Sequence, residues 1–228
     1  MGEAVTTRAV LLDFYGTLGE STWTSNWLDE LFTARGYVIR RGHAADEWDG
    51  QEHDEHSQSR DHYVAWLRSR WVELLTDSGV PRAEHDDFLA AIDARRSEWE
   101  MRLYPEALEV LHGLRARGLR VVLCSNWDWD LGDHVTKLGL AGLFDEVVCS
   151  AWLGARKPHP RVFHAALDAA GVDADAAVFV GDNVVADIEG AVAAGIRAVH
   201  VWRGTSEPPP LPDGAERIAD LRGLLDLV

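Results

Sequence analysis

Four short motifs in the sequence contain side chains that can act as nucleophiles, metal ligands or anion-binding groups. In order along the chain they read DFYGT, CSN, RKP and GDNVVAD. Their candidate residues are Asp13, Tyr15, Gly16 and Thr17 in the first motif, Ser125 and Asn126 in the second, Lys157 in the third, and Asp182 and Asp187 in the fourth. A carboxylate such as Asp13 can attack an electrophile and form a covalent ester. The other motifs would then have to hold and neutralise the transferred group.

Each of the later motifs offers a group suited to that task. Asp182 and Asp187, together with the carboxylate of the first motif, form an oxygen-rich set of the kind that binds Mg²⁺. Lys157 lies in a loop that two prolines stiffen, and its ammonium can bind a negatively charged group. The neutral donors of the second motif and the backbone amides of residues 14–17 can hold the oxygens of the transferred group.

Short apolar segments precede these motifs and predict the strands that carry them. The predicted strands lie at 9–14, 119–126, 144–150, 176–183 and 196–202. Segments with helical spacing lie between or after them, at 105–118, 159–171, 186–195 and 217–228. This alternation predicts an α/β fold, a doubly wound parallel sheet with helices on both faces. Because ligands of such sheets bind beyond the carboxyl ends of the strands, the motif residues should converge on one crevice.

One long segment interrupts the alternation. Between residues 20 and 102 no strand pattern occurs, and the clearest segments, at 21–36 and 59–79, begin at Ser or Thr and end at glycine, as helices do. We therefore predict a helical insert at 20–102 and a core formed by 1–19 and 103–228.

The four motifs, in this order, resemble those of the haloacid dehalogenase-like (HAD) hydrolase superfamily. The resemblance implies a Rossmann-like catalytic core and a helical cap, of the type called C1, formed by the insert. It implies that Asp13 is the nucleophile and that Asp13, the backbone carbonyl of Tyr15, Asp182 and Asp187 hold or support Mg²⁺. Together with the residue chemistry, it gives as catalytic candidates Asp13, Tyr15, Ser125 and Lys157, and as substrate- or phosphate-binding candidates Gly16, Thr17, Ser125, Asn126, Trp127 and Lys157.

Tyr15 departs from the pattern of the family's phosphatases, which usually have Asp at this place. That Asp protonates the leaving-group oxygen and then activates water. The family's 2-haloacid dehalogenases often have Tyr here, but they use no metal and lack the leading acid of the fourth motif, which this chain keeps as Asp182. Without a cation the fourth-motif acids would repel Asp13 and hinder it as a nucleophile. We therefore favour a Mg²⁺-dependent phosphatase that acts on a small phosphorylated metabolite through an aspartyl phosphate.

Two alternatives stay open at this point. One is a 2-haloacid dehalogenase that works through an aspartyl ester without metal. Arg40 and Arg41 are candidates for binding its substrate carboxylate, although solvated surface arginines are the preferred interpretation. The other is a catalytically weak binding protein with the same fold, because the usual acid is missing.

The ten tryptophans are numerous for a chain of this length. Trp23, Trp27 or Trp127 could stack on a ring or sugar of the substrate. For three others in the insert, core packing is the preferred interpretation, namely Trp66, Trp71 and Trp99.

The formal net charge of −16 limits the partners that the chain could bind. So negative a field repels nucleic acid and anionic membrane surfaces, and we expect neither as a partner. No stretch reaches the roughly 18 apolar residues of a membrane span. The two cysteines, Cys124 and Cys149, form no disulfide framework and fit a reduced, cytoplasmic setting. The expected partner is a small-molecule substrate, and the expected oligomeric state is a monomer or a homodimer.

Overall fold

The computed structural model describes residues 6–21, 23, 26–40 and 52–228, and its main element is a six-stranded sheet. The order is β5-β4-β1-β6-β7-β8, and every neighbouring pair is parallel. The strands are β1 (Ala9–Leu12), β4 (Arg120–Ser125), β5 (Glu146–Cys149), β6 (Ala177–Gly181), β7 (Arg197–Val201) and β8 (Glu216–Ile218). The first five match the apolar segments of the sequence, so those predicted strands are confirmed.

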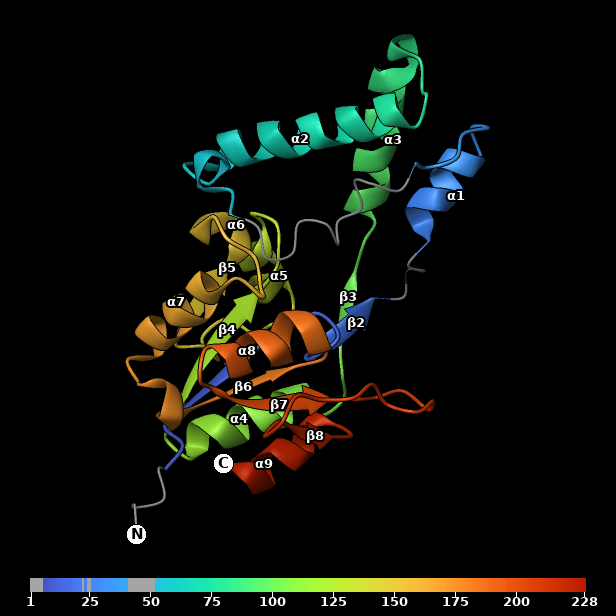
Figure 1. Cartoon of the computed structure of the whole chain (residues 1–228). Coiled ribbons are helices and arrows are strands. Elements are labelled where there is room, and N and C mark those ends of the chain that lie inside the picture. The colour runs from blue at the N-terminus through green and yellow to red at the C-terminus, as the bar shows by residue number, and fades with distance from the viewer. Residues whose placement is uncertain (1–5, 22, 24–25, 41–51) are drawn as a thin grey trace.

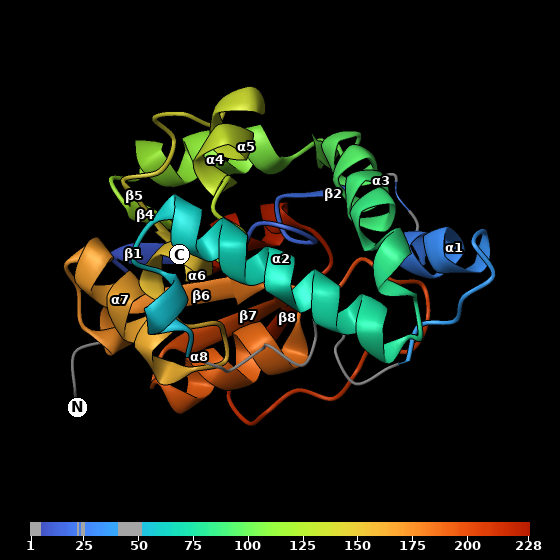
Figure 2. The same cartoon turned by 90° about the horizontal axis from the view of Figure 1, so that it is seen from above.

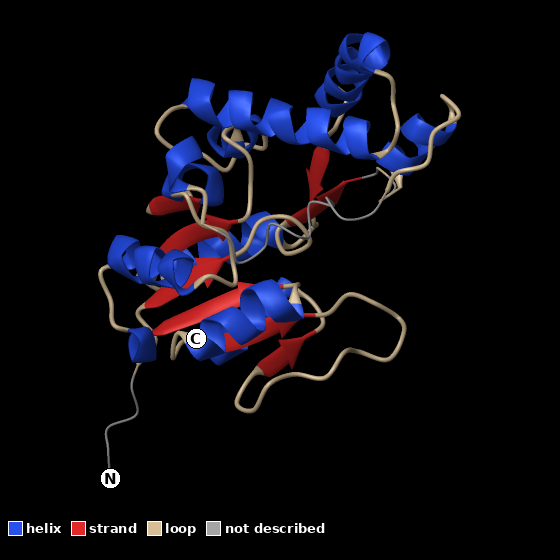
Figure 3. Cartoon of the chain, turned by 45° about the horizontal axis from the view of Figure 1, so that its top comes forward, coloured by secondary structure: helices blue, strands red, loops and turns tan. Residues whose placement is uncertain are grey.

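Helices cover both faces of this sheet (Figures 1 and 3). One face packs against α4 (Ala107–Ala116), α5 (Leu131–Lys137) and α9 (Leu224–Leu227). The other packs against α7 (Pro160–Ala170) and α8 (Gly190–Ala193), and the one-turn helix α6 (Ser150–Leu153) follows β5. Within β1, Val10 and Leu12 belong to the first layer, whereas Ala9 and Leu11 belong to the second. Successive side chains of a strand point to opposite faces, and both faces of β1 are covered by helices, so β1 is apolar throughout. The prediction of a doubly wound α/β fold is confirmed.

The helix predicted at 217–228 is wrong in its first part. Residues Glu216–Ile218 form β8, which pairs with β7, and a 3₁₀ turn at Leu221–Gly223 then leads into the short α9. The backbone amide of Trp202 donates to the Ile218 carbonyl at 2.9 Å. Pairing with β7 satisfies backbone groups that would otherwise be left at a sheet edge, and this outweighs the helical spacing of the local sequence.

Three helices of the insert lie above the core in Figure 1, and Figure 2 shows them from above. They are α1 (Trp27–Thr33), α2 (Arg60–Asp77) and α3 (His85–Ser97), with 3₁₀ turns at Asp54–His56 and Arg82–Glu84. Helix α2 begins as predicted, because the Ser59 side chain accepts a hydrogen bond from the His62 amide at 3.3 Å. Helix α1 is shorter than the predicted 21–36. The insert has its own apolar cluster, which includes Phe32, Leu75, Phe88 and Ile92.

The connection between the insert and the sheet corrects a second prediction. We expected no strand between 20 and 102, but β2 (Gly19–Ser21) and β3 (Met101–Leu103) form an antiparallel pair. Each of these strands is only three residues long and lies at one end of the insert. Such short segments carry no periodicity of their own, so only their pairing across the fold reveals them.

Asp128, in the loop after β4, ties two helices of the insert to the core. The Tyr63 hydroxyl of α2 donates to Asp128 Oδ1 at 2.8 Å, and the Arg96 guanidinium of α3 pairs with Oδ2. Burial and the Asp128 charge raise the pKa of Tyr63, so its hydroxyl keeps the proton that it donates. Among the described residues, no helix is both long and apolar enough to cross a membrane.

Candidate active site

Asp13 lies just beyond the carboxyl end of β1, at the centre of the sheet. Its backbone amide donates to the Val180 carbonyl of β6 at 2.9 Å, and only 6% of the residue is exposed. The Thr17 hydroxyl donates to Asp13 Oδ2 at 3.1 Å. The Lys157 ammonium donates to Oδ1 at 2.7 Å. Both carboxylate oxygens are therefore held in a fixed direction.

Lys157 is a buried cation with all three of its donors engaged. Its Nζ lies 2.7 Å from Asp13 Oδ1, 2.6 Å from Asp187 Oδ1 and 3.0 Å from the Cys124 carbonyl. Burial alone would lower the pKa of this lysine, but the Asp13 and Asp187 carboxylates outweigh burial and raise the pKa. Lys157 therefore remains charged beside the candidate nucleophile.

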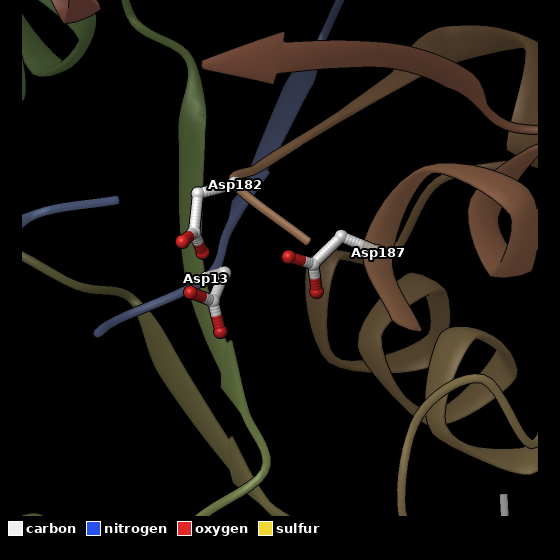
Figure 4. Close-up of side chains that lie close together, drawn as sticks. All are labelled: Asp13, Asp182 and Asp187. Atoms are coloured by element: carbon white, nitrogen blue, oxygen red, sulfur yellow. The ribbon is translucent and has the colours of Figure 1, made fainter. Parts of the chain in front are cut away.

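The carboxylates of Asp13, Asp182 and Asp187 lie close together (Figure 4). One ligand oxygen from each lies within 4.8 Å of those of the others. Burial and the nearby Asp13 charge raise the pKa of Asp182 to about 7. Burial also raises the pKa of Asp187 to about 6, although Lys157 opposes that rise. Crowded carboxylates of this kind favour a bound cation, and oxygen ligands suit Mg²⁺.

Two glycines make room for these acids. Gly16 has φ +84°, and a Cβ there would lie 2.1 Å from Asp182 Oδ2. Gly181, at the end of β6, lies so close to Asp187 that a Cβ would come within 2.3 Å of its Oδ2. A residue with a side chain at either position would displace one of the candidate metal ligands.

Asn126 joins the second motif to the third. Its Nδ2 donates to the Lys157 carbonyl at 3.0 Å, and its Oδ1 accepts from the Lys157 amide at 2.7 Å. Ser125 ends β4 and is buried. The paired bonds fix the backbone of Lys157, so Asn126 acts on the position of the cation.

The predicted site residues gather around one cavity of about 380 Å³. Those that line it are Asp13, Tyr15, Ser125, Asn126, Lys157, Asp182 and Asp187. Tyr15 is 43% exposed there, whereas Gly16 and Thr17 lie in the loop behind it and touch the site through Asp182 and Asp13. Trp127 does not line this cavity. Its ring packs edge-on against Phe14 at 5.1 Å and faces a neighbouring cavity.

Three residues that the sequence did not indicate also line the cavity, namely Arg156, Asn183 and Ala186. The Asn183 amide donates to Asp187 Oδ2 at 3.0 Å, and its side chain accepts from the Ala186 amide at 2.9 Å, which caps the turn. Its position directly after Asp182 was a usable signal. Arg156 stands next to Lys157 in RKP, but spacing alone does not reveal which way its side chain points.

The two arginines considered for a substrate carboxylate lie elsewhere. Arg40 does not line the cavity, and its backbone amide donates to Ser78 Oγ at 3.2 Å. Arg41 lies outside the described residues.

Curated relatives share about half of their length with the chain. Over 121 residues the chain is 43% identical to a phosphoserine phosphatase of Thermus thermophilus, which covers 53% of this chain and 49% of that protein. A phosphoglycolate phosphatase of Rhodospirillum rubrum is 39% identical over 119 residues, which cover 52% of this chain and 49% of that protein.

Solved structures match the chain over nearly its whole length. The structure of a 2-haloacid dehalogenase from Pseudomonas syringae has a TM-score of 0.63 at 25% identity and covers 97% of this chain and 98% of that one. A family model described as haloacid dehalogenase-like hydrolase matches residues 7–195. This match spans β1, the insert and the strand ends that carry all the candidate residues. The chain therefore belongs to the haloacid dehalogenase-like hydrolase family.

Proposed function

We propose that the protein is a Mg²⁺-dependent phosphatase that hydrolyses a small phosphorylated metabolite through an aspartyl phosphate. The observation that supports this most is the meeting of a held carboxylate, Asp13, with a buried ammonium and two further acids at one cavity. Phosphoryl transfer needs this kind of charge-neutralising site, because its transition state carries negative charge on several oxygens.

Asp13, Asp182 and the backbone carbonyl of Tyr15 would hold the cation, with Asp187 as a supporting group. The raised pKa values of Asp182 and Asp187 fit this assignment, since a cation relieves the repulsion that causes part of the rise. When bound, Mg²⁺ neutralises negative charge on the phosphoryl oxygens.

The reaction has two steps. An Asp13 oxygen attacks phosphorus, a new P–O bond forms, and the bond to the leaving group breaks with its electron pair on the leaving oxygen. Water then attacks the aspartyl phosphate, the bond between phosphorus and Asp13 breaks, and inorganic phosphate departs. Lys157 orients Asp13 for the attack, and the buried Ser125 hydroxyl at the cavity wall donates to a phosphoryl oxygen.

We also propose a domain organisation for the chain. Residues 1–19 and 103–228 form the catalytic core, and residues 20–102 form a C1-type cap that covers the site. The β2–β3 pair supports this boundary, because both of its strands lie where the chain passes from one part to the other.

The test is a panel of phosphate monoesters with and without Mg²⁺. We expect hydrolysis of 4-nitrophenyl phosphate that stops with EDTA and returns when Mg²⁺ is added. The similarity to a dehalogenase structure and the exposed Tyr15 favour one second candidate, a 2-haloacid dehalogenase. Release of chloride from 2-chloropropionate that ignores EDTA would establish that alternative. Intact Mg²⁺ binding with no turnover of any ester would instead support a binding role.

Tyr15→Asp is expected to raise the turnover of alkyl phosphates. Phenols ionise near pH 10, so a tyrosine is a weak acid, whereas a carboxylic acid can protonate a departing alkoxide. A gain of about 10²-fold in kcat for glycerol phosphate fits the usual contribution of general acid catalysis. Tyr15→Phe is the matched control and should not show this gain. An unchanged kcat in Tyr15→Asp would mean that another group already supplies the proton.

A further inference from the structure

A second cavity, of about 440 Å³, lies between the insert and the loop after β4. Four indole rings line it, from Trp23 before α1, Trp27 at the start of α1, Trp99 after α3, and Trp127 after β4. Trp99, for which the sequence favoured core packing, contacts Trp127 at 5.4 Å between ring centroids. We name this space the tryptophan cavity.

The tryptophan cavity adjoins the Asp13 cavity. Tyr15 lines the Asp13 cavity, and its ring lies 6.0 Å from that of Trp99. Asn126 and Trp127 are consecutive residues, and each lines one of the two spaces. The indoles of Trp99 and Trp127 therefore lie beside the Asp13 cavity, next to Tyr15.

The charged groups of the tryptophan cavity already compensate one another. Asp128 accepts from Tyr63 and pairs with Arg96. Asp130 accepts from the Trp127 indole nitrogen at 3.1 Å and lies 3.5 Å from His134 Nε2. The carboxylates that could bind a ligand ammonium, those of Asp128 and Asp130, thus already have partners within the protein.

The indole faces are the main contact surfaces that remain. Trp27, Trp99 and Trp127 are only partly buried, whereas the Arg95 guanidinium lies over Trp23 at 4.4 Å. Partly exposed rings that meet at steep angles suit a flat, uncharged ring, which can stack on one indole and meet the edge of another.

We propose that the tryptophan cavity binds the leaving group and that the substrate is a phosphate ester of a planar aromatic alcohol. This inference rests on the proposed phosphatase function. The identity of Tyr15 agrees with it, because a phenolate leaves with its electron pair far more readily than an alkoxide and needs no general acid. In the first step the bond between phosphorus and the aryl oxygen breaks, and the phenolate takes its proton from water.

The test compares phosphonates, which cannot be hydrolysed at their P–C bond, by calorimetric titration in the presence of Mg²⁺. Phenylphosphonate should bind about tenfold more tightly than methylphosphonate, since one well-placed aromatic contact contributes about that factor. Trp99→Leu and Trp27→Leu should each remove most of this preference. Trp152→Leu, outside the tryptophan cavity, is the matched control and should retain it.

Binding separates the failure of this inference from the failure of the proposed function. Equal affinity for the two phosphonates would overturn the inference, even in an active phosphatase. Tighter binding of 2-aminoethylphosphonate than of phenylphosphonate, lost in Trp99→Leu, would overturn it in favour of a cationic ligand. A preference for the phenyl compound that depends on Trp99 and Trp27, without turnover of any ester, would support the cavity assignment and reject the phosphatase.

Discussion

Replacing Asp13 with asparagine is expected to abolish hydrolysis of every phosphate ester while leaving the fold intact. The amide has nearly the same shape as the carboxylate, but it cannot form the ester that the reaction requires. Loss of a covalent nucleophile lowers kcat by about four orders of magnitude or more. Continuous measurement of phosphate release, with circular dichroism to verify folding, checks this expectation.

The matched control is Asp175→Asn, a substitution of the same type at an exposed position outside the site. It should leave kcat and the melting temperature unchanged. If Asp13→Asn retained activity within tenfold of the unsubstituted protein, the nucleophile would have to be another group. A covalent phosphate adduct, trapped by acid quench and found by mass spectrometry in the unsubstituted protein and in Asp175→Asn but not in Asp13→Asn, gives an independent readout.

Replacing Lys157 with methionine is expected to cost both activity and stability. The lysine is 1% exposed and pairs with two buried carboxylates, so its removal leaves Asp13 and Asp187 without a counter-charge. Breaking a buried ion pair by removing one partner lowers the free energy of unfolding by about 3–5 kcal/mol. Urea unfolding at pH 8 without divalent cations measures this loss.

The pH dependence of that loss gives a second readout. Lys157 lowers the pKa of Asp187. Without Lys157, the pKa of Asp187 in the folded protein, already about 6, rises further above its value in the unfolded chain. A carboxyl group with a raised folded-state pKa stabilises the fold below its unfolded pKa and loses that contribution as the pH rises through the folded-state value. The defect of Lys157→Met should therefore be largest at pH 8 and shrink toward pH 5.

Lys137, the other of the two lysines in the chain, provides the control. It pairs with Glu100 at 3.5 Å, and both side chains are 65% exposed. Exposed ion pairs contribute little to stability, so Lys137→Met should unfold like the unsubstituted protein. Equal stability of Lys157→Met and Lys137→Met at pH 8 would contradict the structural role given to Lys157.

Much of the core could be predicted because its buried strands are marked by short apolar segments of the local sequence. Strands of a parallel sheet are buried on both faces, so they appear as short apolar segments such as 9–14 and 176–183. Their carboxyl ends lie along one edge of the sheet, which is why the sequence alone places Asp13 and Asp182 together.

The strands that the sequence did not predict depend on pairing partners far away in the sequence. Strand β8 forms only because β7 offers it backbone partners, and β2 pairs with β3 across the whole insert. The contact between Trp99 and Trp127 likewise joins the end of α3 to the loop after β4. Neither composition nor periodicity contains information about such pairings.

Tyr63 of α2 and Arg96 of α3 contact the same carboxylate, that of Asp128, so movements of the two helices away from the core are coupled. If α2 and α3 leave the core, Asp128 loses a hydrogen bond and an ion pair together, whereas a small tilt of one helix leaves the other contact to hold it back. Coupled contacts of this kind favour two discrete arrangements over a continuum of intermediate ones. In the proposed phosphatase, product would then escape in separate, complete openings, and their frequency would set an upper limit on turnover.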